Sequence, residues 1–533
     1  MDEDPLNIDG EGLTRAEILR RAAIVGGAAA ITTVSPGLAQ AAIREAAQQR
    51  GGVLQCAIAS ATPADNADPI RQPNQFTGVL GTALYNTLVR YDQDTWEVFP
   101  MLAARWNHSA DYKRWTFVLR QGVEFHDGKT LTAQDVAWTL HRILTQSLTP
   151  NLYARLSSVL DHNGIRVLNR RTVRLVLKSP DPFLLLVLGQ RDAEIVQNGQ
   201  GETRGRVNGV GTGPFKLKSL QPGVSAEVER FTNYWEEGRL PLLNGVRLVV
   251  IAEQSTKLQS VASGPSHFSD PIPPSLLPVA RRTSGLRVQL ARSARMMDVA
   301  MQQDVAPFND NRVRTAFKLA IDRKRLITLA ARGYGSVAAD IPVQRIDPYF
   351  PPSLNNRSRD LVMARNLLSA AGHRDGLDVT LNTTDLNGEK DFALAFAEMV
   401  REANIQVRVR EWDPATYTSQ VWLRTPMFTQ GAWSRRHPNE ILALTLLAPA
   451  TAGSFNEPHF TDPRLAQLVN QARAAQDPTR QRNLFRQALQ LVADNSGWVV
   501  PYFYHVPFIS KAGVREVGLD PVSIINFKRA TIR

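Results

Sequence analysis

A short apolar run near the N-terminus is the strongest constraint on this chain, because it indicates that the rest of the protein folds after export. A basic, helix-prone stretch, Arg15–Arg21, precedes a small-residue apolar core, Ala22–Val34, and then Ala39–Ala41, an A-x-A cleavage pattern. The core falls short of the about 20 residues that a bilayer-spanning helix needs. We therefore predict that residues 1–41 are a removable signal peptide and that the protein is periplasmic or extracellular.

Two export routes fit this segment. Thr14–Arg20 resembles the twin-arginine pattern, although Ala16 stands where the second arginine belongs and the pair Arg20-Arg21 lies just downstream. A Sec signal with incidental arginines is the alternative. The first residues are acidic, which is unusual for a short Sec signal, so we favour the twin-arginine route.

A single cysteine, Cys56, excludes an internal disulfide. Val53–Gln55 precede it where a lipoprotein would carry a small-residue lipobox, so we expect no lipid anchor. The run Val53–Ala59 is apolar and predicts a buried strand, in which Cys56 is a core thiol.

The charge balance is strongly basic. Without the signal the chain has 59 basic and 44 acidic residues, a net charge of +15. Such a charge is compatible with nucleic acid, an anionic membrane or an anionic ligand. The arginines are scattered singly and in pairs, without a basic tract or interleaved aromatic residues, so we expect a solvated basic surface and no nucleic-acid partner.

After the signal, short apolar strands alternate with amphipathic stretches, which indicates a mixed α/β fold. A chain of about 490 residues exceeds one ordinary core, so two or three domains are expected. The pattern predicts a strand at Ile405–Val409 and helices at Asp135–Leu144, Asn311–Ala331, Leu361–Ala371 (ending at Gly372), Leu394–Ala403, Arg464–Ala475 and Arg480–Asp494.

Three motifs that suggest chemistry have simpler structural interpretations. His126-Asp127-Gly128 is interpreted as a tight turn, with Thr132 capping the helix that follows. Gly211–Pro214 lacks the Gly-Lys-Ser/Thr ending of a phosphate loop. Asp310 is expected to cap a helix. No His/Cys/Asp/Glu cluster has metal-ligand spacing, and we predict no metal and no cofactor.

Several segments, in order, resemble the extracellular solute-binding proteins of ABC importers, in the peptide/nickel/opine class known as family 5. The strongest match is Trp115–Ile143, which is similar to the family's Y-T-F-x-L-R-x-G-V-x-F-H-D-G pattern and its continuation. The others are Gly51–Leu54, Tyr85–Asp92, Pro100–Trp106, Gly211–Gly223, Asn233–Trp235, Pro307–Arg323, Ala364–His373 and Val500–Ser510.

The resemblance implies a periplasmic-binding-protein-like α/β fold, with two lobes that close on a solute about a hinge and an extra domain inserted in one lobe. Lobe I would comprise residues 51–88, 206–290 and 495–533. The inserted domain would be 89–205, and lobe II would be 291–494. The implied partners are a small solute and the membrane subunits of an ABC permease, and the expected state is a monomer.

The same resemblance suggests where the solute binds. Peptide-binding members carry an aspartate for the peptide ammonium group shortly after a tryptophan, whereas here Trp433-Ser434-Arg435-Arg436-His437-Pro438 contains no acid. A guanidinium favours a carboxylate or phosphate, so a peptide-like or anionic conjugate is predicted. The alternatives are that both arginines point into solvent, that Trp433 packs in a core, and that His437 is structural. The expected ligand contacts are Trp433, Ser434, Arg435, Arg436, His437, Tyr85 and Asn86.

A secreted hydrolase is the alternative from another functional class. The chain has no G-x-S-x-G and no H-E-x-x-H motif, and Cys56 has no evident histidine partner, so we predict that it is not an enzyme. Within the family, a metal-chelate or oligosaccharide receptor remains open.

Overall fold

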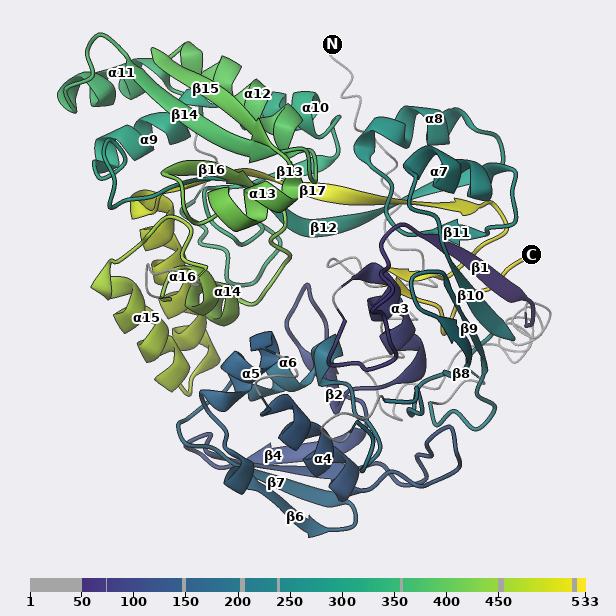
Figure 1. Ribbon diagram of the computed structural model, residues 1–533. Coiled ribbons are helices and arrows are strands. Elements are labelled where there is room, and N and C mark those ends of the chain that lie inside the picture. The colour runs from purple at the N-terminus through teal and green to yellow at the C-terminus, as the bar shows by residue number, and fades with distance from the viewer. Residues whose placement is uncertain are drawn as a thin grey trace, which may run out of the picture. The chain divides into compact units, whose positions relative to one another are not determined.

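Two long antiparallel strands, β12 (Leu286–Met301) and β17 (Trp498–Lys511), join the two halves of the largest sheet in the computed structural model (Figure 1). The structure describes residues 50–533 except 73, 146–149, 202–206, 237–239, 355–357, 449–454 and 520–524. The fold is mixed α/β, as the alternating sequence pattern predicts.

The largest sheet has eleven strands among the described residues. Its order is β15-β14-β16-β12-β17-β11-β1-β10-β9-β8, and β13 pairs with β17. The bounds are β1 Val53–Ile58, β8 Phe215–Gln221, β9 Ser225–Arg230, β10 Gly245–Val250, β11 Phe268–Ser269, β13 Gly335–Val337, β14 Leu377–Thr384, β15 Ile405–Trp412 and β16 Met427–Gln430.

A separate four-stranded antiparallel sheet has the order β4-β5-β7-β6. Its strands are β4 Ala103–His108, β5 Arg114–Leu119, β6 Ile165–Asn169 and β7 Thr172–Val176. Two short hairpin-like pairs are β2 Val89–Tyr91 with β3 Val98–Pro100, and β18 Gly518–Leu519 with β19 Ile525–Asn526.

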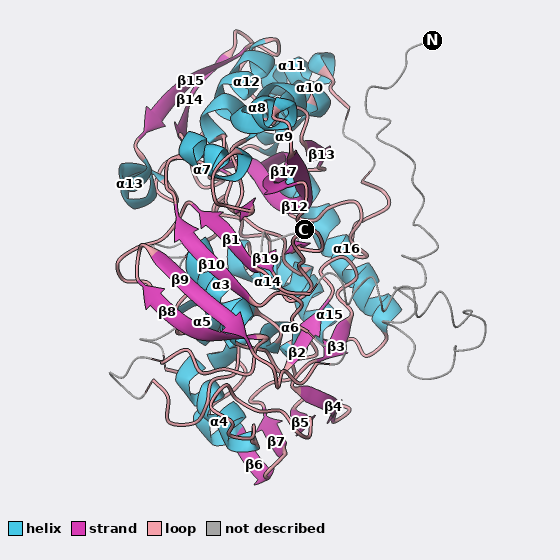
Figure 2. Cartoon of the chain, turned by 90° about the vertical axis from the view of Figure 1, so that its right-hand side faces the viewer, coloured by secondary structure: helices cyan, strands magenta, loops and turns pink. Residues whose placement is uncertain are grey.

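Helices flank both sheets (Figures 1 and 2). Their bounds are α3 Gln75–Leu84, α4 Ala133–Ile143, α5 Pro150–Ser157, α6 Leu184–Leu188, α7 Gln254–Ala262, α8 Leu277–Arg282, α9 Asn311–Ala320, α10 Arg323–Ala330, α11 Leu361–Ala370, α12 Glu389–Arg401, α13 Pro414–Thr416, α14 Pro438–Thr445, α15 Pro463–Ala474 and α16 Pro478–Asn495.

Successive side chains of β12 point to opposite faces of the sheet, so this half of the sheet has a hydrophobic core on each face. Met297 and Val299 pack in the cluster that contains residues of α9 and α12. Met296 and Ala300 point the other way, into the cluster that contains residues of α14, α15 and α16. Trp433, the first residue of the predicted site segment, packs against this second cluster.

Most local predictions are confirmed. Thr132 and Asp135 form a capping box at the start of α4, Gly128 has φ +84° in the predicted turn, and Asp310 caps α9 by accepting from the backbone N of Arg312. Cys56 is fully buried in β1. Burial lowers the pKa of His126 to about 4, although hydrogen bonds to the segment 209–213 oppose the shift. Its Nδ1 accepts from the backbone N of Gly211 at 3.1 Å, and its Nε2 lies 3.1 Å from the carbonyl of Gly213.

The single helix predicted at Asn311–Ala331 is wrong. Ile321 is extended, with φ −99° and ψ 138°, and ends α9. Asp322 then caps a new helix, α10, by accepting from the backbone N of Arg325 at 3.0 Å. Local capping therefore overrides a continuous helical periodicity. Helix α12 also begins at Glu389, five residues before the predicted Leu394.

The signal-peptide prediction falls on residues 1–41, which lie outside the described residues. Across the described part of the chain, no helix combines the length and apolar character needed to cross a membrane. The division into lobe I, inserted domain and lobe II at the stated boundaries stays a prediction.

Candidate functional site

The segment that follows β16 positions most of the predicted site residues. All four residues of β16 are buried, and the chain leaves the sheet at Gly431. Pro438 starts α14, and His437 caps it, with Nδ1 accepting from the backbone N of Asn439 at 3.1 Å. Residues 433–437 therefore connect a buried strand to a capped helix, and both of their ends are fixed.

Trp433 is partly exposed, and a buried carboxylate fixes its orientation. Its indole Nε1 donates to Oε1 of Glu457 at 2.8 Å. Trp422 donates to the same oxygen at 2.9 Å, and buried Trp498 donates to Oε2 at 3.0 Å. The Phe455 ring packs edge-on against Trp433, with ring centroids 5.7 Å apart. Trp433 thus packs on the core through one edge while part of its surface meets solvent.

Two more buried carboxyl groups lie near Glu457. Burial raises the pKa of Glu457 and that of Glu389 to about 7. Burial also raises the pKa of Asp298 well above its usual range, and the neighbouring Glu457 and Glu389 add to the shift. Neither oxygen of Asp298 has a hydrogen-bond partner among the described residues. Burial without such a hydrogen-bond partner thus favours the protonated form of Asp298.

Arg435 is buried, with 7% of its surface exposed, and it meets two aspartates. Its Nη1 lies 2.7 Å from Oδ1 of Asp94, and its Nη2 lies 3.1 Å from Oδ2 of Asp347. The Trp96 indole donates to the same Asp347 oxygen at 2.8 Å. Burial raises the pKa of Asp347, and Arg435 opposes that shift. Trp96 has φ 62°, a left-handed backbone that a bulky residue adopts only when its surroundings impose it.

Arg436 meets a different acid. Its Nη1 donates to Glu440, four residues along in α14, and Arg155 of α5 lies 2.9 Å from the same carboxylate. Gln190 also donates to Glu440, at 3.1 Å. The segment Arg435–Glu440 is therefore a contact between α14 and parts of the chain before residue 200.

The alternative that both arginines point into solvent is wrong, because each guanidinium contacts protein carboxylates. Binding of a solute by Arg435 or Arg436 stays a prediction. So does a role for Ser434, which is partly exposed.

His437 is 2% exposed and packs among aromatic rings. It lies edge-on to Trp96, Tyr349 and Phe485 and tilted against Phe183. Burial lowers its pKa to about 3, so the imidazole is neutral. The structural interpretation of His437 fits this geometry.

Tyr85 and Asn86 lie elsewhere and are both buried. The Tyr85 hydroxyl donates to the carbonyl of Ala67 at 2.8 Å. Asn86 Oδ1 accepts from Thr212 Oγ1 and from Trp235 Nε1. The Thr212 bond joins the Gly211–Pro214 segment to the residues that follow α3. The structure does not bring Tyr85 and Asn86 together with Trp433, and their role as ligand contacts stays a prediction.

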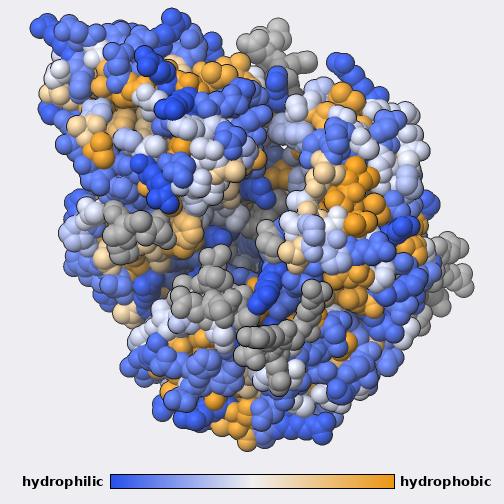
Figure 3. Space-filling view, viewed as in Figure 1, coloured by the Kyte–Doolittle hydropathy of each residue, from blue (hydrophilic) through white to orange (hydrophobic). Residues whose placement is uncertain are grey.

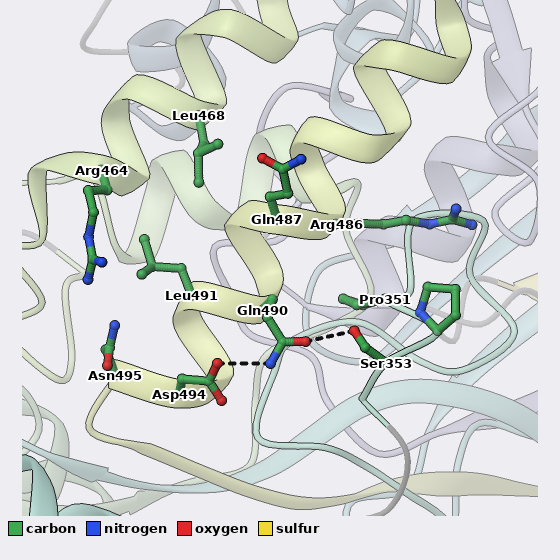
Figure 4. Close-up of a pocket in the computed structure, with 11 residues that line it drawn as sticks. Pro351, Ser353, Arg464, Leu468, Arg486, Gln487, Gln490, Leu491, Asp494 and Asn495 are labelled. Atoms are coloured by element: carbon green, nitrogen blue, oxygen red, sulfur yellow. Dashed lines mark hydrogen bonds between the residues drawn. The ribbon is translucent and has the colours of Figure 1, made fainter.

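The surface is deeply hollowed between the α13–α16 side and the β1–β10 side of the view in Figure 3. A different cavity, of about 550 Å³, lies between α15, α16 and the loop 351–353 (Figure 4). Gln490 bridges its wall by contacting Ser353 and Asp494, each at 2.9 Å. None of the predicted site residues lines this cavity. The described residues hold no group of three His, Cys, Asp or Glu side chains able to bind a metal.

Sequence reasoning missed Glu457, Asp298, Asp347 and Trp96. Trp96 and Asp347 are 251 residues apart, and Arg435 and Asp94 are 341 apart. Nothing local in the sequence links such residues. A lone acid within an apolar strand, as at Asp298, is the one signal that was available.

Known structures have this fold. The binding protein AgaA of A. tumefaciens R10, solved with agropinic acid, aligns with a TM-score of 0.72 and 23% identity over 90% of this chain and 99% of its own. DppA of Helicobacter pylori, solved with the peptide STSA, aligns with a TM-score of 0.76 and 19% identity over 92% and 99%. The architecture is that of a periplasmic binding protein.

The sequence comparisons give the family. Residues 97–453 match the family described as bacterial extracellular solute-binding proteins, family 5, middle region. The glutathione-binding protein GsiB of Salmonella typhi is 25% identical over 450 residues, which cover 81% of this chain and 85% of that protein. This chain belongs to family 5 of the bacterial extracellular solute-binding proteins, the receptors of ABC importers.

Proposed function

We propose that this chain captures a peptide-like or amino-acid-conjugate solute between two lobes and delivers it to an ABC permease without altering it. The observation that carries the proposal is the β12–β17 pair, which links the two halves of one sheet. Between Ala291 and Arg295 the register of β12 shifts against Val506 and Tyr504 of β17. Such a register shift interrupts the ladder and bends the strand, and in this proposal the two halves rotate about it.

Hinge closure is tested by small-angle scattering on residues 42–533. A solute that binds should reduce the radius of gyration at saturation, because the lobes close around it. An unchanged radius with a solute shown to bind by calorimetry would argue against closure. Recovery of the solute intact by mass spectrometry separates a receptor from a hydrolase, which would consume it.

The solute class rests on two observations. One relative is named a glutathione-binding protein, and AgaA was solved in complex with agropinic acid. The segment Trp433–His437 lacks the ammonium-binding acid of peptide receptors. Arg435 and Arg436 already contact Asp94 and Glu440, so a solute carboxylate would compete with these side chains. We propose an acid-bearing conjugate as the preferred solute.

A calorimetric panel tests this choice. Glutathione, an opine, an ordinary dipeptide, an oligosaccharide and a nickel–histidine chelate are titrated into the same preparation, and the methyl esters of the best acid-bearing solute serve as matched controls. Binding of the acid with at least tenfold loss for its ester supports the proposal. Equal affinity for acid and ester, or a preference for the dipeptide, sugar or chelate, overturns it.

The proposed location is the periplasm or cell exterior, reached through the signal at residues 1–41, with the twin-arginine route favoured over Sec. N-terminal sequencing of the protein from the cell envelope should begin within a few residues of Ala42. Intact Met1 there would contradict the proposal. Loss of export in a strain without twin-arginine translocation would support that route, and unchanged export would support Sec.

A further inference from the structure

One face of the four-stranded sheet carries arginines and no acid. Alternation along the strands turns Trp115, Phe117, Val173 and Leu175 inward, where all four are buried. The residues between them face outward. The outward-facing positions of β4, β5, β6 and β7 include four exposed arginines and no Asp or Glu: Arg105, Arg114, Arg166 and Arg174.

The strand register brings two of these arginines directly opposite one another. Arg166 of β6 is the cross-strand partner of Arg174 of β7, and Thr116 of β5 lies on the other side of Arg174. Arg174 Nε donates to Thr116 Oγ1 at 3.2 Å. Like charges in directly opposite positions destabilise a sheet. The arrangement therefore has a cost that a bound anion would relieve.

These exposed arginines differ from the buried, paired arginines of the molecule. Within the described residues, none of the four forms an ion pair, whereas Arg142 lies 2.6 Å from Asp68 and Arg323 lies 2.7 Å from Asp340. Arg170 and Arg171, in the turn between β6 and β7, extend the basic surface and are also exposed. The pKa of exposed Asp111 is lowered by hydrogen bonds from Ser109 and Lys113, with a further contribution from Arg114. The other three arginines expose their charge to solvent.

Aliphatic side chains are interspersed with this charge. Leu168 of β6 is 45% exposed and Val176 of β7 is 40% exposed. Helix α4 contacts β6 and β7, and it covers the opposite, inward side of the sheet (Figures 1 and 2). Neighbouring strands of a sheet lie about 4.8 Å apart, so arginines on adjacent strands of this face lie close together.

We propose that this face, hereafter the arginine face, docks the protein on the anionic lipid headgroups of a membrane. Guanidinium groups bind phosphate through paired hydrogen bonds, and exposed aliphatic groups between them can enter the interfacial region. Charge spread over the open face of four strands can meet a broad anionic surface at several points, whereas an acidic peptide is normally held along a sheet edge or in a groove. The proposal goes beyond solute capture and places the receptor close to the bilayer that holds its permease.

The test is co-sedimentation of the protein, residues 42–533, with vesicles at about 0.1 M salt. Binding is expected to vesicles containing phosphatidylglycerol and not to pure phosphatidylcholine, and it should weaken as salt rises. Each arginine near an anionic surface contributes about a fivefold change in partitioning. Arg166→Gln/Arg174→Gln should therefore weaken binding by about 25-fold.

The control is Arg374→Gln/Arg408→Gln, which removes the same charge from exposed positions outside this sheet and should change binding by less than about threefold. Circular dichroism and the melting temperature verify that both variants fold. If both variants lost vesicle binding to the same extent, the binding would depend on overall charge alone, and the proposal would be overturned. The proposal would also be overturned if the parent protein did not bind phosphatidylglycerol vesicles, or if it bound polyglutamate and not the vesicles. Solute affinity, measured on the same variants, should not change, so failure of docking is distinguishable from failure of solute capture.

Discussion

The indole nitrogen of Trp433 lies 2.8 Å from Oε1 of Glu457, an oxygen that Trp422 also contacts at 2.9 Å. One buried carboxyl group therefore sets the orientation of two partly exposed rings. Trp498, on the other oxygen, anchors the same group to β17. A substitution of Glu457 should therefore alter the orientation of Trp433 and Trp422, which are partly exposed, although Glu457 itself is fully buried.

Glu457→Ala should destabilise the protein by about 2–4 kcal/mol, because buried indole N–H groups lose their acceptor. Glu457→Gln should cost less, since an amide oxygen still accepts. Urea unfolding at pH 7 measures both. The exposed Glu398→Ala in α12 is the control and should stay within about 0.5 kcal/mol of the parent. Equal stabilities of Glu457→Ala and the parent would mean that the indole bonds contribute nothing.

Glu389 should make the protein less stable as pH rises. Burial raises its pKa from 4.5 to about 7, so the folded state holds the proton more tightly than the unfolded chain does. The contribution of this proton to the free energy of unfolding is complete below about pH 4.5 and is lost as pH rises through 7. Glu389→Gln stays neutral and loses no stability in this way. Between pH 4.5 and pH 8, its free energy of unfolding should therefore rise relative to that of the parent by on the order of 3 kcal/mol. A difference that stays constant over that range in urea titrations would contradict the assignment.

His437 has the opposite pH dependence. Burial lowers its pKa from 6.5 to about 3, so the unfolded chain takes up the proton first and stability falls as pH drops below 6.5. His437→Asn keeps a side-chain acceptor for the start of α14 but removes the ring. We expect it to be less stable at pH 7 by about 1–3 kcal/mol and to lose less stability between pH 6.5 and pH 4. An unchanged acid slope would show that His437 does not titrate in this range.

Local chemistry made much of the fold predictable. The spacing of Val136, Leu140 and Ile143 predicted α4, and Thr132 gave its cap. Periodicity alone failed at Ile321 and Asp322, since both α9 and α10 bury apolar residues and only the cap at Asp322 marks the break. Capping signals therefore outweigh a continuous apolar pattern where the two disagree.

The candidate site was less predictable because its contacts join distant parts of the chain. The sequence showed that Arg435 stands where an acid is usual, but its partners Asp94 and Asp347 come from two other segments. Their approach depends on the turn at Trp96, whose left-handed backbone is not a preference of tryptophan. Tertiary packing determines that geometry, and no local pattern encodes it.

Arg435→Ala should strongly destabilise the protein. It leaves the Asp347 carboxylate, whose side chain is 2% exposed, without its cationic partner, and breaking a buried pair costs about 3–5 kcal/mol. Asp94→Asn removes the other ion pair, but the Asp94 side chain is 61% exposed, so we expect less than about 1 kcal/mol. Thermal unfolding measures both variants.

Solute titration of the same variants, below the melting temperature of each, separates a structural Arg435 from one that meets the solute. If Arg435 binds an anionic group directly, Arg435→Ala should weaken the best acid-bearing solute by one to two orders of magnitude, since a charged hydrogen bond contributes about 1.5–3 kcal/mol. Asp94→Asn, which keeps the guanidinium, should then bind at least as tightly as the parent. Parent-like affinity in both variants would assign Arg435 to the contact with Asp94 and Asp347 alone.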